Sequence, residues 1–316
     1  MNFKYLFIHL CLAFIVFACA NQESNQIKKE KSSPITVVAS EKKGFATFTH
    51  ADQPDNRIGY RFFEHTPLVY EKVEAVAGEP DPGLEADSVT SWLDDFSSRK
   101  EVLIHQKVIE KDDNWIAQSW TFYLSPTDDG IDMLLTVQTF DEGLPAYYGI
   151  QQCFRMSGKT NAEWRQVIAC TPAFSEYDLW ANADQKISLT YVLRNNTWQA
   201  LPADSIAVGA RTPLGILFDT LQFGEPLPEW VGPYQALMTE PVDNGLVTRI
   251  NEEKTWVCGI FWENTSHVTD HHPADCLHSI VNIGNIPPHS MRAIRGKIYW
   301  FRGTLSDLSV KFERDF

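Results

Sequence analysis

The densest group of side chains that could do chemistry lies in a short segment towards the C-terminal end of the chain. Its members are His267, Asp270, His271, His272, Asp275 and His278. Imidazole and carboxylate groups can hold a metal or transfer protons near neutral pH. The histidines lack the spacing of a helical metal motif, so we predict no metal and take His278 as a candidate general base. The alternatives stay open: solvated loop residues for His271 and His272, and a core histidine for His278.

A second group of polar side chains lies in the middle of the chain. Its members are Gln151, Gln152, Arg155, Arg165, Glu176 and Asp178. Glu176 and Asp178 are paired carboxylates beside aromatic residues, a combination that suits acid/base cleavage of a glycosidic bond. Arg155 and Arg165 could clamp the carboxylate of a uronic acid or a sulfate group, with the glutamine amides as further substrate-binding groups. The alternative is that the aromatics fill a core edge and the two acids form a turn.

Four cysteines occur in two pairs, and each pair brackets a segment that resembles a hairpin. The pairs are Cys153 with Cys170 and Cys258 with Cys276. Their spacing matches no C-x-x-C metal motif. Two states stay open for each pair: a disulfide between opposed strands, which an oxidising compartment permits, or two buried thiols.

The second hairpin could also carry a sugar-binding surface. Pairing of its two cysteines would place Trp256 opposite His278. The same register would place Trp262 opposite His272. Aromatic faces stack on the C–H groups of sugar rings while polar neighbours bind the hydroxyls. We therefore take Trp256, Trp262 and His272 as candidate substrate-binding residues.

Strand signals dominate the elements that must position these residues. Runs rich in β-branched and aromatic residues, each bounded by turn residues, cover Glu101–Ile109, Trp115–Leu124, Ile131–Phe140 and Ile187–Leu193. Many short strands at this spacing predict an all-β fold, a large antiparallel β-sandwich with few short helices. The helices expected are Ala86–Phe96 and Thr304–Phe316, the second with Leu305, Leu308 and Phe312 on one stripe.

The N-terminal segment has the form of an export signal. A lysine precedes an apolar stretch of about 14 residues, which is shorter than the roughly 20 that a spanning helix needs. Cys19 closes this stretch after an alanine, and the pattern resembles the lipobox of bacterial lipoproteins, in which the cysteine is acylated. The resemblance implies a signal peptide over residues 1–18 and an outer-membrane lipid anchor, on the periplasmic or the cell-surface side. We expect a flexible tether over residues 19–34 and one β-sandwich domain over residues 35–316.

Composition and missing motifs exclude several classes of function. The formal net charge of −14 makes the chain poorly suited to bind nucleic acid or an anionic lipid surface through charge. The sequence has no P-loop, no G-x-S-x-G elbow and no H-E-x-x-H, which weighs against common NTPases, α/β-hydrolases and zincins. The sequence identifies no cofactor.

The segment Cys276–Gly303 resembles the closing strands of galactose-mutarotase-like β-sandwich proteins, with a strand, a proline-bearing turn and a final amphipathic strand. The resemblance implies a glycan ligand and, as leading hypothesis, a membrane-anchored polysaccharide lyase or glycoside hydrolase. A lyase would use His278 as base and Arg155 to neutralise a uronate. A hydrolase would use Glu176 and Asp178. The alternatives are a non-catalytic glycan-binding lipoprotein of a polysaccharide-uptake system and a structural envelope lipoprotein.

Overall fold

The structure is a computed structural model, and its folded unit spans Ser33–Phe316. The described residues are 32–39, 45–69, 86–112, 115–156, 180, 188–202, 207–227, 240–271 and 276–316. Five of the predicted site residues lie outside these ranges, namely Cys19, Arg165, Glu176, Asp178 and His272. Cys170 lies outside them as well.

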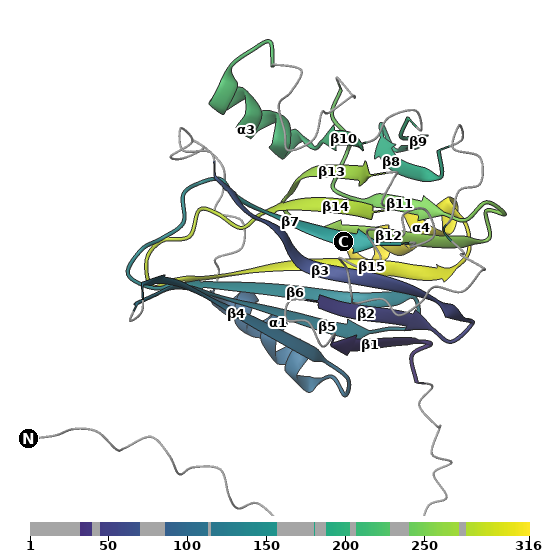
Figure 1. The fold of residues 1–316 in the computed structure, drawn as a ribbon, viewed down its shortest axis with the longest axis horizontal. Helices are drawn as coiled ribbons and strands as arrows, with labels where there is room; N and C mark the ends of the chain where they lie inside the picture. The colour runs from purple at the N-terminus through teal and green to yellow at the C-terminus, as the bar shows by residue number, and fades with distance from the viewer. Residues whose placement is uncertain are drawn as a thin grey trace, which may run out of the picture. The chain divides into compact units, whose positions relative to one another are not determined.

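Two antiparallel sheets form the two layers of a β-sandwich, which confirms the predicted fold class (Figure 1). The first sheet contains, in spatial order, β1 (Ile35–Ala39), β2 (Phe45–His50), β3 (Gln53–Val69), β7 (Tyr148–Arg155), β14 (Cys276–Asn282), β13 (Thr265–His271) and β10 (Ala207–Arg211). The second contains β4 (Leu103–Asp112), β5 (Trp115–Pro126), β6 (Gly130–Thr139), β15 (Met291–Arg302), β12 (Trp256–Trp262), β11 (Val247–Ile250), β8 (Thr190–Arg194) and β9 (Thr197–Ala200). We call them the seven-stranded and the eight-stranded sheet.

Alternation along the strands divides core residues from outward residues. In β15, Ile294, Ile298 and Trp300 belong to the main core between the sheets. Arg295 and Lys297 occupy the alternate positions and therefore project from the opposite, outer face of the eight-stranded sheet. This alternation assigns each residue of a strand to the core or to the outer face of its sheet.

A buried ion pair joins the two sheets inside the core. Arg249 of β11 and Asp270 of β13 lie 3.6 Å apart between Nη1 and Oδ2, with side-chain exposures of 2% and 0%. The Nη2 atom of Arg249 also donates a hydrogen bond of 3.1 Å to the carbonyl oxygen of Trp180. Burial of two charges is costly unless both are paired, so this contact fixes how β11 and β13 face each other.

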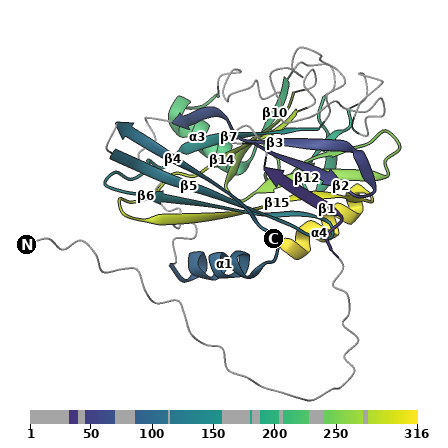
Figure 2. The same cartoon turned by 60° about the horizontal axis from the view of Figure 1, so that its bottom comes forward.

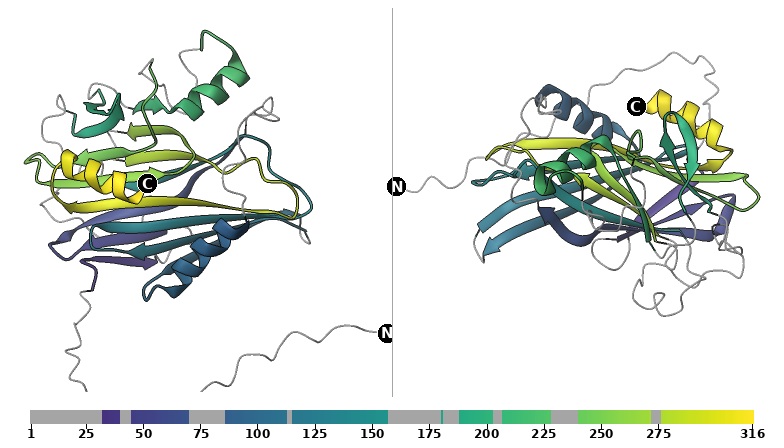
Figure 3. Two further views of the ribbon diagram at one scale, coloured as in Figure 1. Left: turned by 180° about the vertical axis from the view of Figure 1, so that it is seen from behind. Right: turned by 90° about the horizontal axis from the view of Figure 1, so that it is seen from above.

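Three helices are described, and they cover outer faces of the sheets (Figures 2 and 3). Helices α1 (Ala86–Ser98) and α4 (Leu305–Asp315) pack on the eight-stranded sheet, through Phe96 and Leu308 respectively. Both confirm sequence predictions. Helix α3 (Pro213–Phe223) packs on β13 of the seven-stranded sheet and was not predicted.

Local capping explains where two of these helices begin. The Thr304 hydroxyl accepts a hydrogen bond from the backbone N–H of Asp307, whose carboxylate accepts one from the Thr304 N–H, which is a capping box. The Thr212 side chain accepts from the N–H of Gly215, and Pro213 occupies the first turn of α3. Among the described residues, no helix combines the length and the apolar character that crossing a membrane requires.

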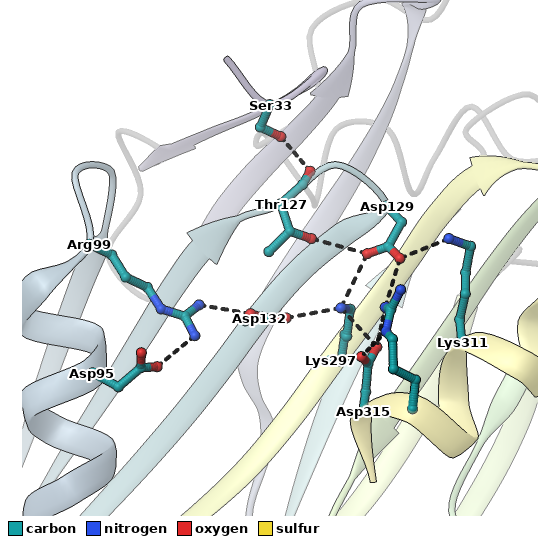
Figure 4. A network of polar contacts seen from close by, with 10 residues as sticks. Ser33, Asp95, Arg99, Thr127, Asp129, Asp132, Lys297, Lys311 and Asp315 are labelled. Carbon is teal, nitrogen blue, oxygen red and sulfur yellow. Dashed lines mark hydrogen bonds and ion pairs between the residues drawn. The ribbon is translucent and has the colours of Figure 1, made fainter. Parts of the chain in front are cut away.

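A network of charged side chains ties α1 and α4 to the eight-stranded sheet (Figure 4). The Nζ atom of Lys297 lies 3.1 Å from a carboxylate oxygen of Asp129 and 3.2 Å from one of Asp132. It also lies 2.9 Å from Asp315 in the last turn of α4. Asp132 is in turn 2.8 Å from the guanidinium of Arg99, which follows α1. A single lysine side chain with 7% exposure thus contacts three carboxylates.

The same network lowers the pKa values of two of its carboxylates, Asp129 and Asp315. Asp129 contacts Lys311 at 2.9 Å and Arg314 at 3.0 Å in addition to Lys297. Partial burial alone would raise the pKa of Asp129, but these cations hold it well below its usual value. Partial burial likewise opposes the shift at Asp315, whose pKa is lowered by Arg314 and Lys297. The folded state therefore favours the ionised form of both groups.

Candidate functional site

Polar side chains from three neighbouring strands meet on the outer face of the seven-stranded sheet. This polar strip consists of Gln151, Cys153 and Arg155 of β7, Cys276 and His278 of β14, and Thr269 and His271 of β13. The register places Cys153 and Thr269 on either side of His278. The structure therefore brings His278 together with Gln151 and Arg155, two predicted site residues that lie far from it in the sequence.

Nearly all of the polar strip is buried. Gln151 is 0% exposed, His278 1% and Arg155 5%. Gln152, the fourth predicted residue in this region, lies on the opposite face of β7 in the core. There its side-chain oxygen accepts a hydrogen bond from the Tyr60 hydroxyl. Gln151 and Gln152, both predicted to bind substrate, therefore face opposite sides of the sheet, as the alternation of side chains along a strand requires.

Sulfur and imidazole groups form the centre of the polar strip. One ligand atom each from Cys153, Cys276 and His278 lies within 4.8 Å of the other two. The Nδ1 atom of His278 is 3.0 Å from the hydroxyl oxygen of Thr269. Arg155 lies directly opposite Cys276 in the pairing of β7 with β14.

These neighbours stabilise a thiolate. Burial alone would raise the pKa of Cys276, but it is lowered to about 6 by hydrogen bonds with Cys153 and His278 and by the positive charges of His278 and Arg155. Cys258 provides the contrast, because burial raises the pKa of its thiol far above the usual value. The pKa values of the two buried thiols thus shift in opposite directions, because Cys276 has polar and charged neighbours whereas the shift of Cys258 comes from burial.

Of the two states left open for Cys258 and Cys276, the structure shows buried thiols, and the two residues do not pair. Cys258 lies in the eight-stranded sheet, opposite Arg249 and Trp300, whereas Cys276 lies in the seven-stranded sheet. Cys153, Cys258 and Cys276 are thiols. The two strands do not form a hairpin because β13 follows β12 and passes into the other sheet.

The tryptophans predicted as a sugar platform are core residues. Trp256 and Trp262 project inward from β12 with exposures of 6% and 0% and belong to the main core. In the pairing of β12 with β15, Trp256 lies opposite Arg302 and Trp262 opposite Gly296. The register that placed Trp256 opposite His278 depended on the cysteine pairing and fails with it.

A serine, a histidine and an aspartate also come together beneath α3. Ser266 Oγ lies 3.0 Å from Nδ1 of His267, whose Nε2 lies 3.1 Å from the Asp219 carboxylate. The elements of a nucleophilic triad are present. However, Ser266 is 0% exposed and its hydroxyl donates to the carbonyl oxygen of Ile280. We interpret this group as the contact that attaches α3 to the sheet.

A cavity of about 390 Å³ opens at the end of the sandwich where β12 passes into β13. We call it the amide-lined cavity because four asparagines line it, namely Asn244, Asn264, Asn282 and Asn285. Phe261 and Trp262 contribute aromatic surface, and Arg292 and Asp243 contribute charge. Sequence analysis missed all of these residues except Trp262.

The four asparagines differ in their hydrogen bonds and in their backbone conformation. The side-chain oxygen of Asn282 accepts hydrogen bonds from the N–H groups of Tyr148 and Gly284, and that of Asn244 accepts one from an N–H of its own turn. Asn264 and Asn285 have positive φ angles of 60° and 63°, a conformation that asparagine tolerates better than most residues. Both residues line the cavity, and within the described part of the chain their side-chain amides have no hydrogen-bond partner. In the sequence these asparagines therefore indicate turns and give no sign of a binding cavity.

No known protein-family profile and no curated protein sequence matches this chain. Among solved structures, it is similar to a candidate aldose 1-epimerase from Escherichia coli, with 11% identity, 85% of this chain and 100% of the other covered, and a TM-score of 0.34. It is also similar to a Synechocystis protein, with 6% identity, coverage of 86% and 97%, and a TM-score of 0.40. A galactose mutarotase related enzyme from Lactobacillus acidophilus has 7% identity, coverage of 65% and 69%, and a TM-score of 0.32. None of these three structures exceeds 11% identity or a TM-score of 0.40.

Proposed function

We propose that this protein binds carbohydrate in the amide-lined cavity. The observation that carries the proposal is that Asn264 and Asn285 line one cavity together with Phe261 and Trp262. A side-chain amide both donates and accepts hydrogen bonds, as a sugar hydroxyl does. The volume of about 390 Å³ falls in the usual range for small-ligand sites, and aromatic lining with few polar groups is typical of them.

The lining favours binding over hydrolysis. Among the described residues of the cavity wall, Asp243 is the one carboxylate. Its two oxygens accept hydrogen bonds of 2.7 Å from the backbone N–H groups of Asn195 and Asn196 and thus fix a hairpin turn. Acid/base cleavage of a glycosidic bond needs a pair of carboxylates. The predicted lyase residues His278 and Arg155 are buried on the polar strip, so the glycan-binding alternative fits the described geometry better.

Lipid anchoring completes the proposal. An acylated Cys19 would hold the cavity beside a membrane, and a polar tether would let it move there. Incorporation of a tagged fatty acid during expression in a bacterial host tests this. The chain should carry the tag, the Cys19→Ser variant should not, and a labelled variant would refute the anchor. Membrane fractionation of the two proteins then tests the outer-membrane location.

The binding proposal is tested with a glycan panel and paired glycine variants. Glycine keeps a left-handed backbone, so Asn264→Gly and Asn285→Gly remove the amides without strain. Each lost hydrogen bond is worth about 0.5–1.5 kcal/mol, so the double variant should lose about 1–3 kcal/mol and bind its glycan roughly 5- to 150-fold more weakly. Lys254→Gly is the matched control, because Lys254 has φ of 56° in the turn before β12, at the other end of that strand.

Calorimetry and thermal-shift measurements on the wild-type chain show first whether any glycan of the panel binds. A glycan that binds the wild type and the Lys254→Gly variant equally, but the double variant weakly, supports the cavity. Equal binding by all three would place the ligand elsewhere, and no binding by any glycan would remove the carbohydrate proposal. Reducing ends and ultraviolet absorbance, measured on the same panel, test the hydrolase and lyase predictions.

A further inference from the structure

We propose that Cys153, Cys276 and His278 form a binding site for a thiophilic metal ion, with zinc as the ion. Their ligand atoms lie within 4.8 Å of one another. Two thiolates and an imidazole are a ligand set that zinc favours, and three protein ligands leave a fourth tetrahedral position for water. This site is separate from the amide-lined cavity and does not depend on a carbohydrate ligand.

The pairing of β7 with β14 builds the ligand set. Cys153 lies opposite His278, and Cys276 precedes His278 by two residues on the same face of β14. Side chains two residues apart on a strand, and side chains directly opposite across a pair, are neighbours on one face of the sheet. Paired strands inside a sheet are a rigid support, which a metal site requires for its geometry.

Thr269 supplies the contact that orients the histidine. Its hydroxyl oxygen is 3.0 Å from Nδ1 of His278, and it comes from the next strand of the sheet, opposite His278 in the register. An Nδ1–H that donates to this oxygen fixes the tautomer and leaves Nε2 as the nitrogen that binds metal. Histidine ligands in metal sites almost always have such a partner for the second nitrogen.

Burial and charge distinguish these cysteines from an ordinary core cysteine. Cys153 and Cys276 are 2% and 1% exposed and pack on each other apart from the main core, whereas Cys258 lies among core hydrophobics. Arg155, opposite Cys276, adds positive charge at the site. Metal binding would displace the thiol protons, and the charge of the ion would compensate the burial of the two sulfur ligands.

Metal titration of the full chain tests the site. The reduced, chelator-treated protein is titrated with Co²⁺, whose bonds to thiolates give charge-transfer absorption, and Zn²⁺ is then added as competitor. We expect about one equivalent of metal per chain, displaced by zinc. Cys276→Ser should abolish the absorption, and Thr269→Val should weaken zinc binding about 10–100-fold. Cys258→Ser is the matched control and should bind as the wild type does, because it also replaces a buried thiol.

Three results would overturn the proposal. The first is a wild-type chain without cobalt–thiolate absorption, which needs no variant and so cannot be confused with misfolding. The second is a Cys276→Ser variant that binds zinc as tightly as Cys258→Ser. The third is a disulfide between Cys153 and Cys276, detected by mass spectrometry in protein that was never exposed to reductant. Circular dichroism of each variant verifies its fold.

Discussion

Replacement of Lys297 by methionine tests whether the charge network holds the sandwich together. The substitution keeps most of the side-chain volume but removes an ammonium group that contacts Asp129, Asp132 and Asp315 at 3.1, 3.2 and 2.9 Å. Asp129 lies in the turn between β5 and β6, Asp132 lies in β6, and Asp315 lies in α4. Loss of the ammonium group should therefore loosen the attachment of α4 to the sheet.

The magnitude follows from burial and from the partners that remain. Removal of one partner of a buried ion pair costs about 3–5 kcal/mol. Here each carboxylate keeps another cation: Asp129 has Arg314, Asp132 has Arg99, and Asp315 has Arg314. We therefore expect a smaller loss, about 2–3 kcal/mol of the free energy of unfolding, or roughly 5 °C in melting temperature for a domain of this size.

Lys311→Met is the control that separates this effect from a general loss of charge. Lys311 has 26% side-chain exposure and contacts one carboxylate, Asp129, at 2.9 Å. Exposed pairs contribute about 0–1 kcal/mol, so this variant should lose little. Urea unfolding followed by tryptophan fluorescence measures both. If Lys297→Met is no less stable than Lys311→Met, the network does not stabilise the fold in the way argued above.

Acid should lower the free energy of unfolding of the wild type, because the pKa values of Asp129 and Asp315 are lowered in the folded state. This stabilisation is complete above the unfolded pKa of about 4 and is lost as pH falls towards the folded values; an Asp129→Asn variant with an unchanged pH slope would contradict it. Thr304→Ala should cost about 1 kcal/mol by removing the capping box, while Thr304→Ser retains it; urea midpoints distinguish the two. Arg249→Met should cost about 3–5 kcal/mol by leaving Asp270 buried without this partner, and Asp270→Leu in the same chain should restore part of it, as thermal unfolding would show.

The fold class was predictable because it depends on local patterns. Runs of β-branched and aromatic residues between turn residues mark the strands. The stripe of Leu305, Leu308 and Phe312 marks α4, where these residues do pack together against the sheet. Helix α3 was missed although Thr212 and Pro213 are start signals and Gly224 follows its end. Its first residues are almost continuously apolar, so they have no clear helical period and resemble a strand.

The polar strip could not be predicted because its members meet through long-range pairing. Sequence reasoning paired each cysteine with the nearest one along the chain, as a hairpin would. The actual neighbours are β7 and β14, and the segment between them contributes strands to both sheets. Local signals determine that a strand forms, whereas the choice of partner depends on how the whole core is filled, which no single run of residues encodes.

One signal in the sequence did point to the polar strip, and its meaning depends on burial. Gln151, Cys153 and Arg155 alternate with core residues in β7, a pattern that usually indicates one solvated face. In the structure every residue of β14, and all but the first of β7, is buried, so this polar face is not exposed to water. Buried polar groups must find partners within the molecule, and they do so here by converging on one another. A strand that has one polar face and is buried on both faces thus indicates a cluster of polar side chains that contact one another. At Cys153, Cys276 and His278 the ligand atoms in this cluster are of the types that bind zinc.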